Sequence, residues 1–99
     1  MYVDIDTTGH ATLRDVGNLR ELKVIAPAIA DADVASALET AGWGQLDGEH
    51  AWLSIAALRE AGTGQEAGWE AGFDDMIAYA TSKDWLSADG LGVRAHLER

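Results

Sequence analysis

Residues 63–85 read TGQEAGWEAGFDDMIAYATSKDW and contain the apolar pattern that decides the predicted fold. Large apolar side chains recur there at helical spacing and form a stripe roughly 100° wide, as expected of a helix that packs on a core. The stripe consists of Trp69, Phe73, Met76, Ile77 and Ala80. Gly68 and Gly72 each cost the helix about 1 kcal/mol relative to alanine. The helix therefore depends on burial of its stripe, at roughly 1.5–3 kcal/mol for each large side chain.

The same stretch contains signals for both ends of the helix. Thr63 and Glu66 form a T-x-x-E pattern, in which the hydroxyl accepts from a backbone N–H three residues on and the glutamate reaches back. Lys83 lies near the other end, where unpaired carbonyls favour a cation. We therefore predict a capping box at the start of this helix.

The composition predicts one globular domain over residues 1–99, with 47% hydrophobic residues to form its core. The formal net charge is −10. A charge of that sign and size disfavours binding to nucleic-acid phosphates and to anionic membranes. It favours a basic protein as partner, and unprotected sheet edges with aromatic content make a homo-oligomer a further expectation.

The chain has no cysteine, so we expect neither a disulfide nor a thiolate metal site. The opening sequence MYVDIDTT has no basic segment followed by an apolar one, and no signal peptide is predicted. No apolar run approaches the roughly 20 residues of a membrane span. These observations predict a cytoplasmic protein without a cofactor or a metal ion.

Turn residues divide the first part of the chain into three predicted strands, at about 2–6, 10–16 and 19–26. Gly9 suits the left-handed position of the first turn, which sets Val3 opposite Leu13 and Ile5 opposite Ala11. The second turn, at Gly17-Asn18, is a two-residue hairpin signal. It implies a second set of pairs: Val16–Leu19, Asp15–Arg20, Arg14–Glu21, Leu13–Leu22 and Ala11–Val24.

Residues 12–22 also permit a helix as the alternative. Leu13, Val16, Leu19 and Leu22 are spaced by three. That spacing drifts around a helix of 3.6 residues per turn, and a Gly-Asn pair would lie in the middle of the helix. The antiparallel meander is therefore the preferred interpretation.

Two shorter helices are predicted in the middle of the chain. Asp31 or Asp33 is a candidate N-cap for a helix that runs to Ala41 and stops at Gly42. Ser54 is the candidate cap of the second helix, over 55–61. Both helices end next to a glycine, as helices often do.

The segment between these helices, residues 43–50, is predicted as a loop. Asp47-Gly48 offers a tight hairpin as the alternative. At the end of the chain, residues 91–97 alternate apolar and polar, which indicates a half-buried strand. Together the segments predict an α+β fold: a small antiparallel sheet, made of the three-stranded N-terminal meander plus the C-terminal strand, covered on one face by three helices.

Asp4-x-Asp6-x-Thr8 resembles the aspartate signature of haloacid-dehalogenase-type phosphatases, in which the first aspartate is the nucleophile and the second the general acid. That family also needs a lysine followed by an acidic metal ligand. Here Asp74-Asp75 precede Lys83, in the opposite order. The resemblance covers five residues, and we do not transfer the family's site to this chain.

The loop around residues 43–52 is the candidate binding surface, because function often lies on loops held by a rigid scaffold. It combines aromatic, acidic and imidazole side chains. The candidate residues are Trp43, Asp47, His50 and Trp52.

No coherent catalytic set is present in the sequence, so an enzyme is the less favoured interpretation. The leading hypothesis is a non-catalytic module that binds a protein or associates with itself. The first alternative is a small-ligand-binding or hydrolytic protein whose site lies in the 43–52 loop. The second is an acidic mimic of nucleic acid, motivated by the net charge.

Overall fold

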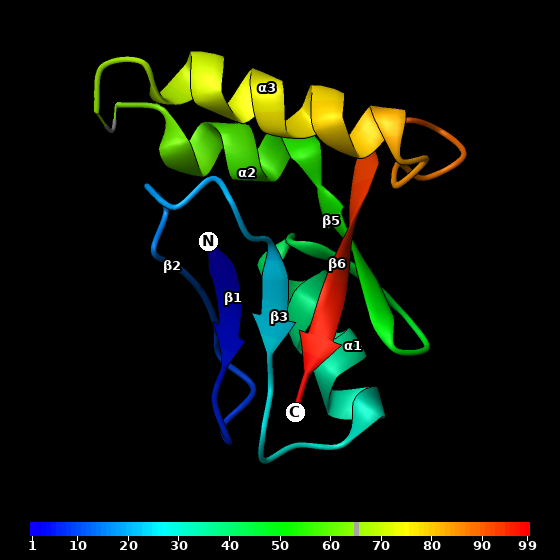
Figure 1. Cartoon of the computed structure of the whole chain (residues 1–99). Coiled ribbons are helices and arrows are strands. Elements are labelled where there is room, and N and C mark those ends of the chain that lie inside the picture. Colours follow the sequence, from blue (N-terminus) through cyan, green and yellow to red (C-terminus); the bar gives the residue numbers. More distant parts are fainter. Residues whose placement is uncertain (65) are drawn as a thin grey trace.

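The computed structural model describes residues 1–64 and 66–99 and has an α+β architecture (Figure 1). Within these residues it contains six strands: β1 (Tyr2–Ile5), β2 (Ala11–Arg14), β3 (Lys23–Ile25), β4 (Gly44–Asp47), β5 (His50–Ser54) and β6 (Gly92–Glu98). It contains three helices: α1 (Asp31–Ala41), α2 (Ile55–Gly62) and α3 (Trp69–Ser82).

The six strands form one mixed sheet in the order β2-β1-β3-β6-β5-β4, curled into a half-barrel. Strand β3 runs parallel to both β1 and β6, and the other neighbours are antiparallel. Helix α1 lies behind the sheet, whereas α2 and α3 lie side by side across one end of it (Figure 1). The predicted small antiparallel sheet of four strands is therefore wrong.

The first predicted turn is confirmed and the second is not. Strands β1 and β2 pair with Val3 opposite Leu13 and Ile5 opposite Ala11, as the first turn implies. Beyond Arg14 the chain does not return along β2, and it forms neither the second hairpin nor the alternative helix over 12–22.

Contacts from elsewhere in the chain explain why residues 15–22 leave the meander. The Met1 ammonium donates to the carbonyl oxygens of Asn18 at 2.5 Å and Glu21 at 2.7 Å. The Trp69 indole Nε1–H donates to the Val16 carbonyl at 2.8 Å. In the predicted hairpin the Val16 and Glu21 carbonyls would accept from the opposite strand, whereas here they accept from Trp69 and Met1. The chain instead enters β3 beside β1.

The 43–50 segment forms a strand and a turn, and the tight-hairpin alternative is confirmed in place of the loop. Strands β4 and β5 pair with Asp47 opposite His50, and Gly48 occupies the left-handed region at φ 62° in the turn. The predicted C-terminal strand is present as β6, with Val93, Ala95 and Leu97 buried as expected. It lies between β3 and β5 rather than at an edge.

All three predicted helices form, but two caps differ and α3 starts only at Trp69, after Gly68. Ser54 caps α2, since its hydroxyl accepts from the Ala57 backbone N–H at 3.1 Å. Helix α1 starts at Asp31 after Ala30, without a side-chain cap. The predicted capping box of α3 is wrong, because Thr63 ends α2 and its hydroxyl donates to a carbonyl in that helix.

The core lies between the inner face of the half-barrel and the helices. Phe73 of α3 is fully buried, and its ring stacks on Trp69 with 5.0 Å between centroids. Helices α2 and α3 approach closely at Gly62, where a Cβ atom would lie 2.0 Å from the Trp69 ring. Of the predicted stripe, Met76 and Ile77 are half-buried. The stripe therefore packs as expected, with Trp69, Phe73 and Ala80 buried.

Candidate binding groove

Of the four residues proposed from the 43–52 segment, Asp47, His50 and Trp52 are neighbours on the β4–β5 hairpin, whereas the Trp43 indole reaches towards β2. Trp43 precedes β4, and its indole Nε1–H donates to the Ala11 carbonyl of β2 at 3.5 Å, which links the two edges of the half-barrel. The Trp52 indole Nε1–H donates to the Asp47 carboxylate at 3.1 Å. These two contacts account for Trp43, Asp47 and Trp52 as parts of the fold, and their role in binding stays a prediction.

His50 lies beside Asp47, its partner across the β4–β5 pair, and shares one face of β5 with Trp52. It is opposite His96 of β6, and the two rings meet edge to face with 6.1 Å between centroids. Of the four predicted residues, His50 alone borders the hollow described next.

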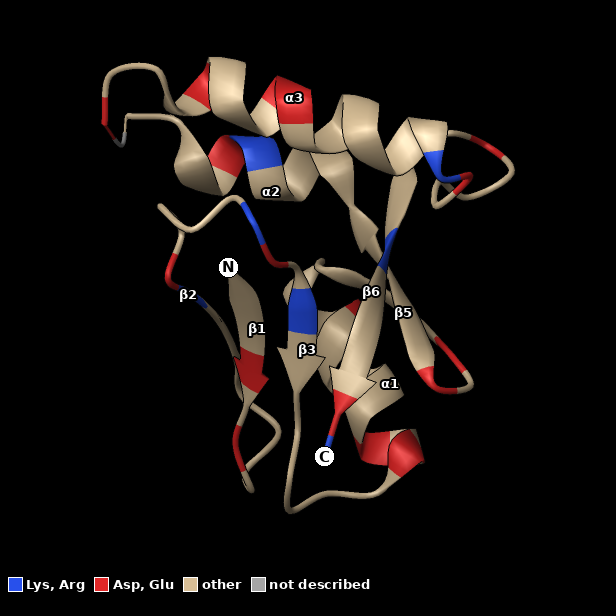
Figure 2. Ribbon diagram, in the orientation of Figure 1, with Lys and Arg blue, Asp and Glu red and all other residues tan. Residues whose placement is uncertain are grey.

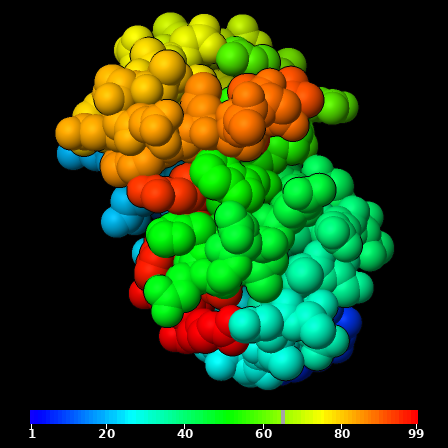
Figure 3. All heavy atoms as spheres, turned by 90° about the vertical axis from the view of Figure 1, so that its right-hand side faces the viewer, coloured from blue at the N-terminus to red at the C-terminus, as the bar shows by residue number. Residues whose placement is uncertain are grey.

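A hollow of about 410 Å³ lies between α3, β6 and the segment that leads into β3. It is lined mainly by apolar and aromatic side chains, among them Leu19, Leu22, Met76, Tyr79 and Trp85, together with the charged Arg20, Glu21 and Arg94. A second hollow of about 200 Å³ shares Leu22, Trp85 and Arg94 with the first and continues to His50 and His96. We call the two together the α3–β6 groove. In Figure 3 the segment between the end of α3 and β6, coloured orange, lies above β6, coloured red.

Backbone hydrogen bonds fix Trp85 in the middle of the groove. Asp84 adopts a left-handed conformation (φ 62°), which ends α3 and reverses the chain, and aspartate tolerates this region better than most residues. The Trp85 N–H then donates to the Ala80 carbonyl at 2.9 Å, and its own carbonyl accepts from the Arg94 N–H at 2.8 Å. The ring is thus held between the end of α3 and β6.

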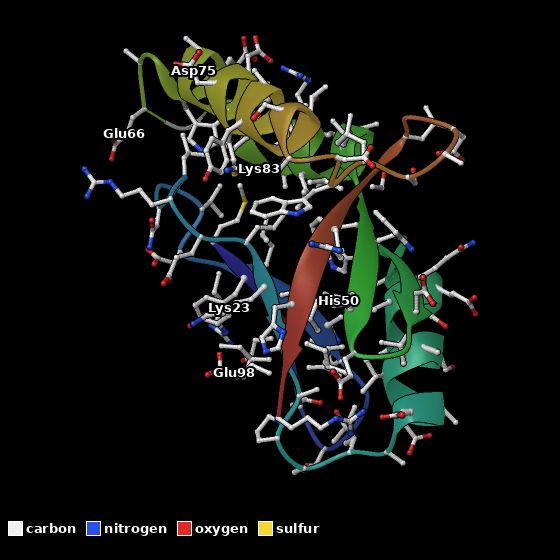
Figure 4. The ribbon with its side chains drawn as sticks, turned by 45° about the vertical axis from the view of Figure 1, so that its right-hand side comes forward. Lys23, His50, Glu66, Asp75, Lys83 and Glu98 are labelled. Atoms are coloured by element: carbon white, nitrogen blue, oxygen red, sulfur yellow. The ribbon has the colours of Figure 1, made fainter. Side chains whose placement is uncertain are left out.

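Aromatic rings in the groove carry cations on their faces. The Arg94 guanidinium lies 5.6 Å from the centroid of Trp85, and the Lys83 ammonium lies 5.5 Å from that of Tyr79. The Tyr79 and Trp85 rings meet edge to face at 5.9 Å. Figure 4 shows Lys83 beneath α3, with His50 and Lys23 further along the sheet. Such stacking orients a cation without neutralising it.

The basic residues of the groove differ from the other basic residues in their partners. Carboxylates in the described residues pair with Arg14, Lys23, Arg59 and Arg99. The other three cations of the seven in the chain are Arg20, Lys83 and Arg94. None of these three makes an ion pair within the described residues. Arg20 and Arg94 line the groove, and Lys83 lies over the ring of Tyr79, which also lines it. The one acid that lines it, Glu21, is 3.9 Å from Lys23.

The indole N–H groups of the four tryptophans also differ in their hydrogen-bond partners. Trp43, Trp52 and Trp69 donate to protein acceptors. The Trp85 indole N–H makes no hydrogen bond to the described residues. No buried side-chain nitrogen or oxygen among them is unpaired, so the Trp85 nitrogen reaches solvent. The groove therefore presents cations and an available N–H donor.

Groups with shifted pKa values lie outside the groove. Burial lowers the pKa of the Met1 ammonium, and a hydrogen bond from Ser87 lowers the pKa of Asp89. The Glu98 carboxylate raises the pKa of Lys23. A hydrogen bond from the Thr8 hydroxyl lowers the pKa of Asp6, whose carboxylate also accepts the Thr8 and His10 backbone N–H groups.

These contacts explain the Asp4-x-Asp6-x-Thr8 pattern as structure. Asp6 holds the turn between β1 and β2 through the bonds to Thr8 and His10, and Asp4 pairs with Arg14 at 2.9 Å. Over residues 1–64 and 66–99, no three His, Asp or Glu side chains gather in a group that could hold a metal ion. None of the helices in that part of the chain is long and apolar enough to cross a membrane.

Comparison of the chain with protein-family models, with curated proteins and with solved structures finds no match. The geometry of the groove is therefore the basis of the functional proposal.

Proposed function

We propose that the protein is a non-catalytic protein-binding module and that its partner binds in the α3–β6 groove. The observation that carries this proposal is the grouping of three cations without ion pairs around an apolar and aromatic hollow. The three are Arg20, Lys83 and Arg94. Aromatic and arginine side chains dominate the energetics of protein interfaces, and both types line this groove.

The polar groups that face the groove support recognition of another molecule. Arg94 and Trp85 offer donors on a preorganised support, since the arginine lies on the ring and the ring is held by backbone bonds. Preorganisation lowers the entropic cost of binding. The groove therefore has the donors, the apolar area and the rigidity of a binding site.

The acidic side chains, in contrast, do not gather at one place on the surface. Figure 2 shows Asp and Glu on all three helices and on strands and turns at both ends of the sheet. Acids gathered on one face would favour mimicry of nucleic acid, and this wide distribution leads us to prefer the groove. A basic protein and a second copy of the chain, the partners suggested by net charge, stay predictions.

A photo-crosslinking residue in place of Tyr79 tests the proposal, because this side chain is 57% exposed at the groove. In lysate from its own cells, we expect a discrete crosslinked product that Arg94→Glu strongly reduces. The matched control carries the crosslinker at Ala32, an exposed position on α1. Products that are identical at both positions, or that do not change with Arg94→Glu, would contradict a binding role for the groove.

A further inference from the structure

The donor set of the groove indicates what kind of partner it binds. Arg20 and Arg94 line it, Lys83 lies over the ring of Tyr79, and the lining residue Trp85 has an indole N–H that reaches solvent. Hydrogen bonds between a guanidinium or ammonium group and a carboxylate are about twice as strong as neutral ones. A partner group that only accepts hydrogen bonds and carries negative charge complements this set.

The chain's own charge makes this local excess of cations informative. The protein has 17 acidic and 7 basic residues. With acids in such excess, each surface cation has many potential carboxylate partners, and the four cations away from the groove all have one. At the groove, aromatic rings support two of the three cations instead. The groove is thus a positive site on a negative molecule.

The shape of the groove selects an extended segment over a small molecule. Sites for small molecules typically enclose 70–90% of the ligand surface. The two hollows here share Leu22, Trp85 and Arg94 as lining residues, and both are partly open to solvent. A peptide can place one apolar side chain in the larger hollow and lay its neighbouring residues along the trough towards His96.

We infer that the occupant of the groove is a partner segment in which a large apolar or aromatic side chain is flanked by aspartate or glutamate. The inference rests on the proposed function and names the chemistry of the partner. The apolar side chain packs on Leu19, Met76 and Trp85. The flanking carboxylates accept from Arg94, Arg20 and Lys83, and the trough between α3 and β6 aligns the segment.

Fluorescence anisotropy with a labelled synthetic peptide, one phenylalanine flanked by aspartates, tests this inference directly. We expect saturable binding that weakens about tenfold in Arg94→Gln, because a charge-assisted bond is lost. Arg14→Gln is the matched control, since it removes the same charge from an arginine that pairs with Asp4 away from the groove. The control variant should bind like the unmodified protein.

Two further peptides separate the contributions of charge and apolar contact. Replacement of each aspartate by asparagine, or of the phenylalanine by alanine, should each weaken binding about tenfold or more. Equal binding of the aspartate and asparagine peptides, or no binding of any peptide, overturns the inference. A Tyr79 crosslink that depends on Arg94, found together with preference for a lysine-flanked peptide, would leave the proposed function intact and overturn this inference alone.

Discussion

Replacement of Phe73 by alanine is expected to lower the free energy of unfolding by about 3–5 kcal/mol, the usual cost of removing a buried aromatic ring. Phe73 is fully buried, stacks on Trp69, and has the Arg59 guanidinium 4.9 Å from its centroid. The cavity left behind lies where α2, α3 and the sheet meet. Urea unfolding followed by circular dichroism measures the change.

Tyr79→Ala provides the control for Phe73→Ala, because it removes an aromatic side chain of similar size from the exposed side of the same helix. We expect it to change the free energy of unfolding by about 1 kcal/mol or less. Equal losses in the two variants would mean that α3 does not pack through the Trp69–Phe73 seam.

Gly62→Ala is expected to destabilise the protein by about 1–3 kcal/mol, as overpacking of a core does. Helix propensity alone predicts the opposite sign, a gain of about 1 kcal/mol. The new Cβ would lie 2.0 Å from the buried Trp69 ring, which is held by its bond to Val16 and by its stack on Phe73. The sign of the change therefore reports whether α2 and α3 touch at this point.

Gly17→Ala is the control for Gly62→Ala. A Cβ atom at Gly17 meets no atom within 4 Å, and its φ lies outside the region that favours glycine. This substitution should leave the free energy of unfolding within about 0.5 kcal/mol of its original value. A stabilised Gly62→Ala protein would contradict the close approach of the two helices.

Elements specified by neighbouring residues could be predicted from the sequence. The register of β1 and β2 follows from one short turn, and α2 follows from a serine cap and a terminal glycine. The apolar stripe of α3 is likewise a local pattern, with Trp69 and Phe73 buried as predicted. In each case, the interacting residues lie within about a dozen positions of one another.

The parallel pairings of β3 depend on distant parts of the chain. No turn links β3 to β1 or β6, and the local Gly17-Asn18 signal favoured an antiparallel hairpin that does not form. The bonds that prevent it come from the Met1 ammonium and the Trp69 indole. Met1 and Trp69 both lie outside residues 10–26, so a hairpin predicted from that segment does not include their hydrogen bonds. The predicted sheet is therefore too small.

The groove could not be predicted from the sequence for the same reason, because its residues are far apart in the chain. Its walls come from residues 19–22, from α3 with Trp85, and from β6, which lie side by side only in the folded chain. The sequence indicates His50 only as part of a loop, whereas in the fold it borders the groove beside His96 of β6. One signal was available in the sequence: Arg94 and His96 share the polar side of an alternating strand.

The most direct test of binding in the α3–β6 groove is a ¹H–¹⁵N NMR spectrum of the four tryptophan indole N–H groups. Single Trp→Phe variants assign the four signals. The spectrum is recorded before and after addition of the aspartate–phenylalanine peptide. We expect the Trp85 signal to move most, because Trp85 lines the groove and its N–H has no acceptor among the described residues, while the signals of Trp43 and Trp69 stay in place. A peptide-induced shift at Trp52 with an unchanged Trp85 signal would contradict this expectation, since Trp52 pairs with Asp47 outside the groove.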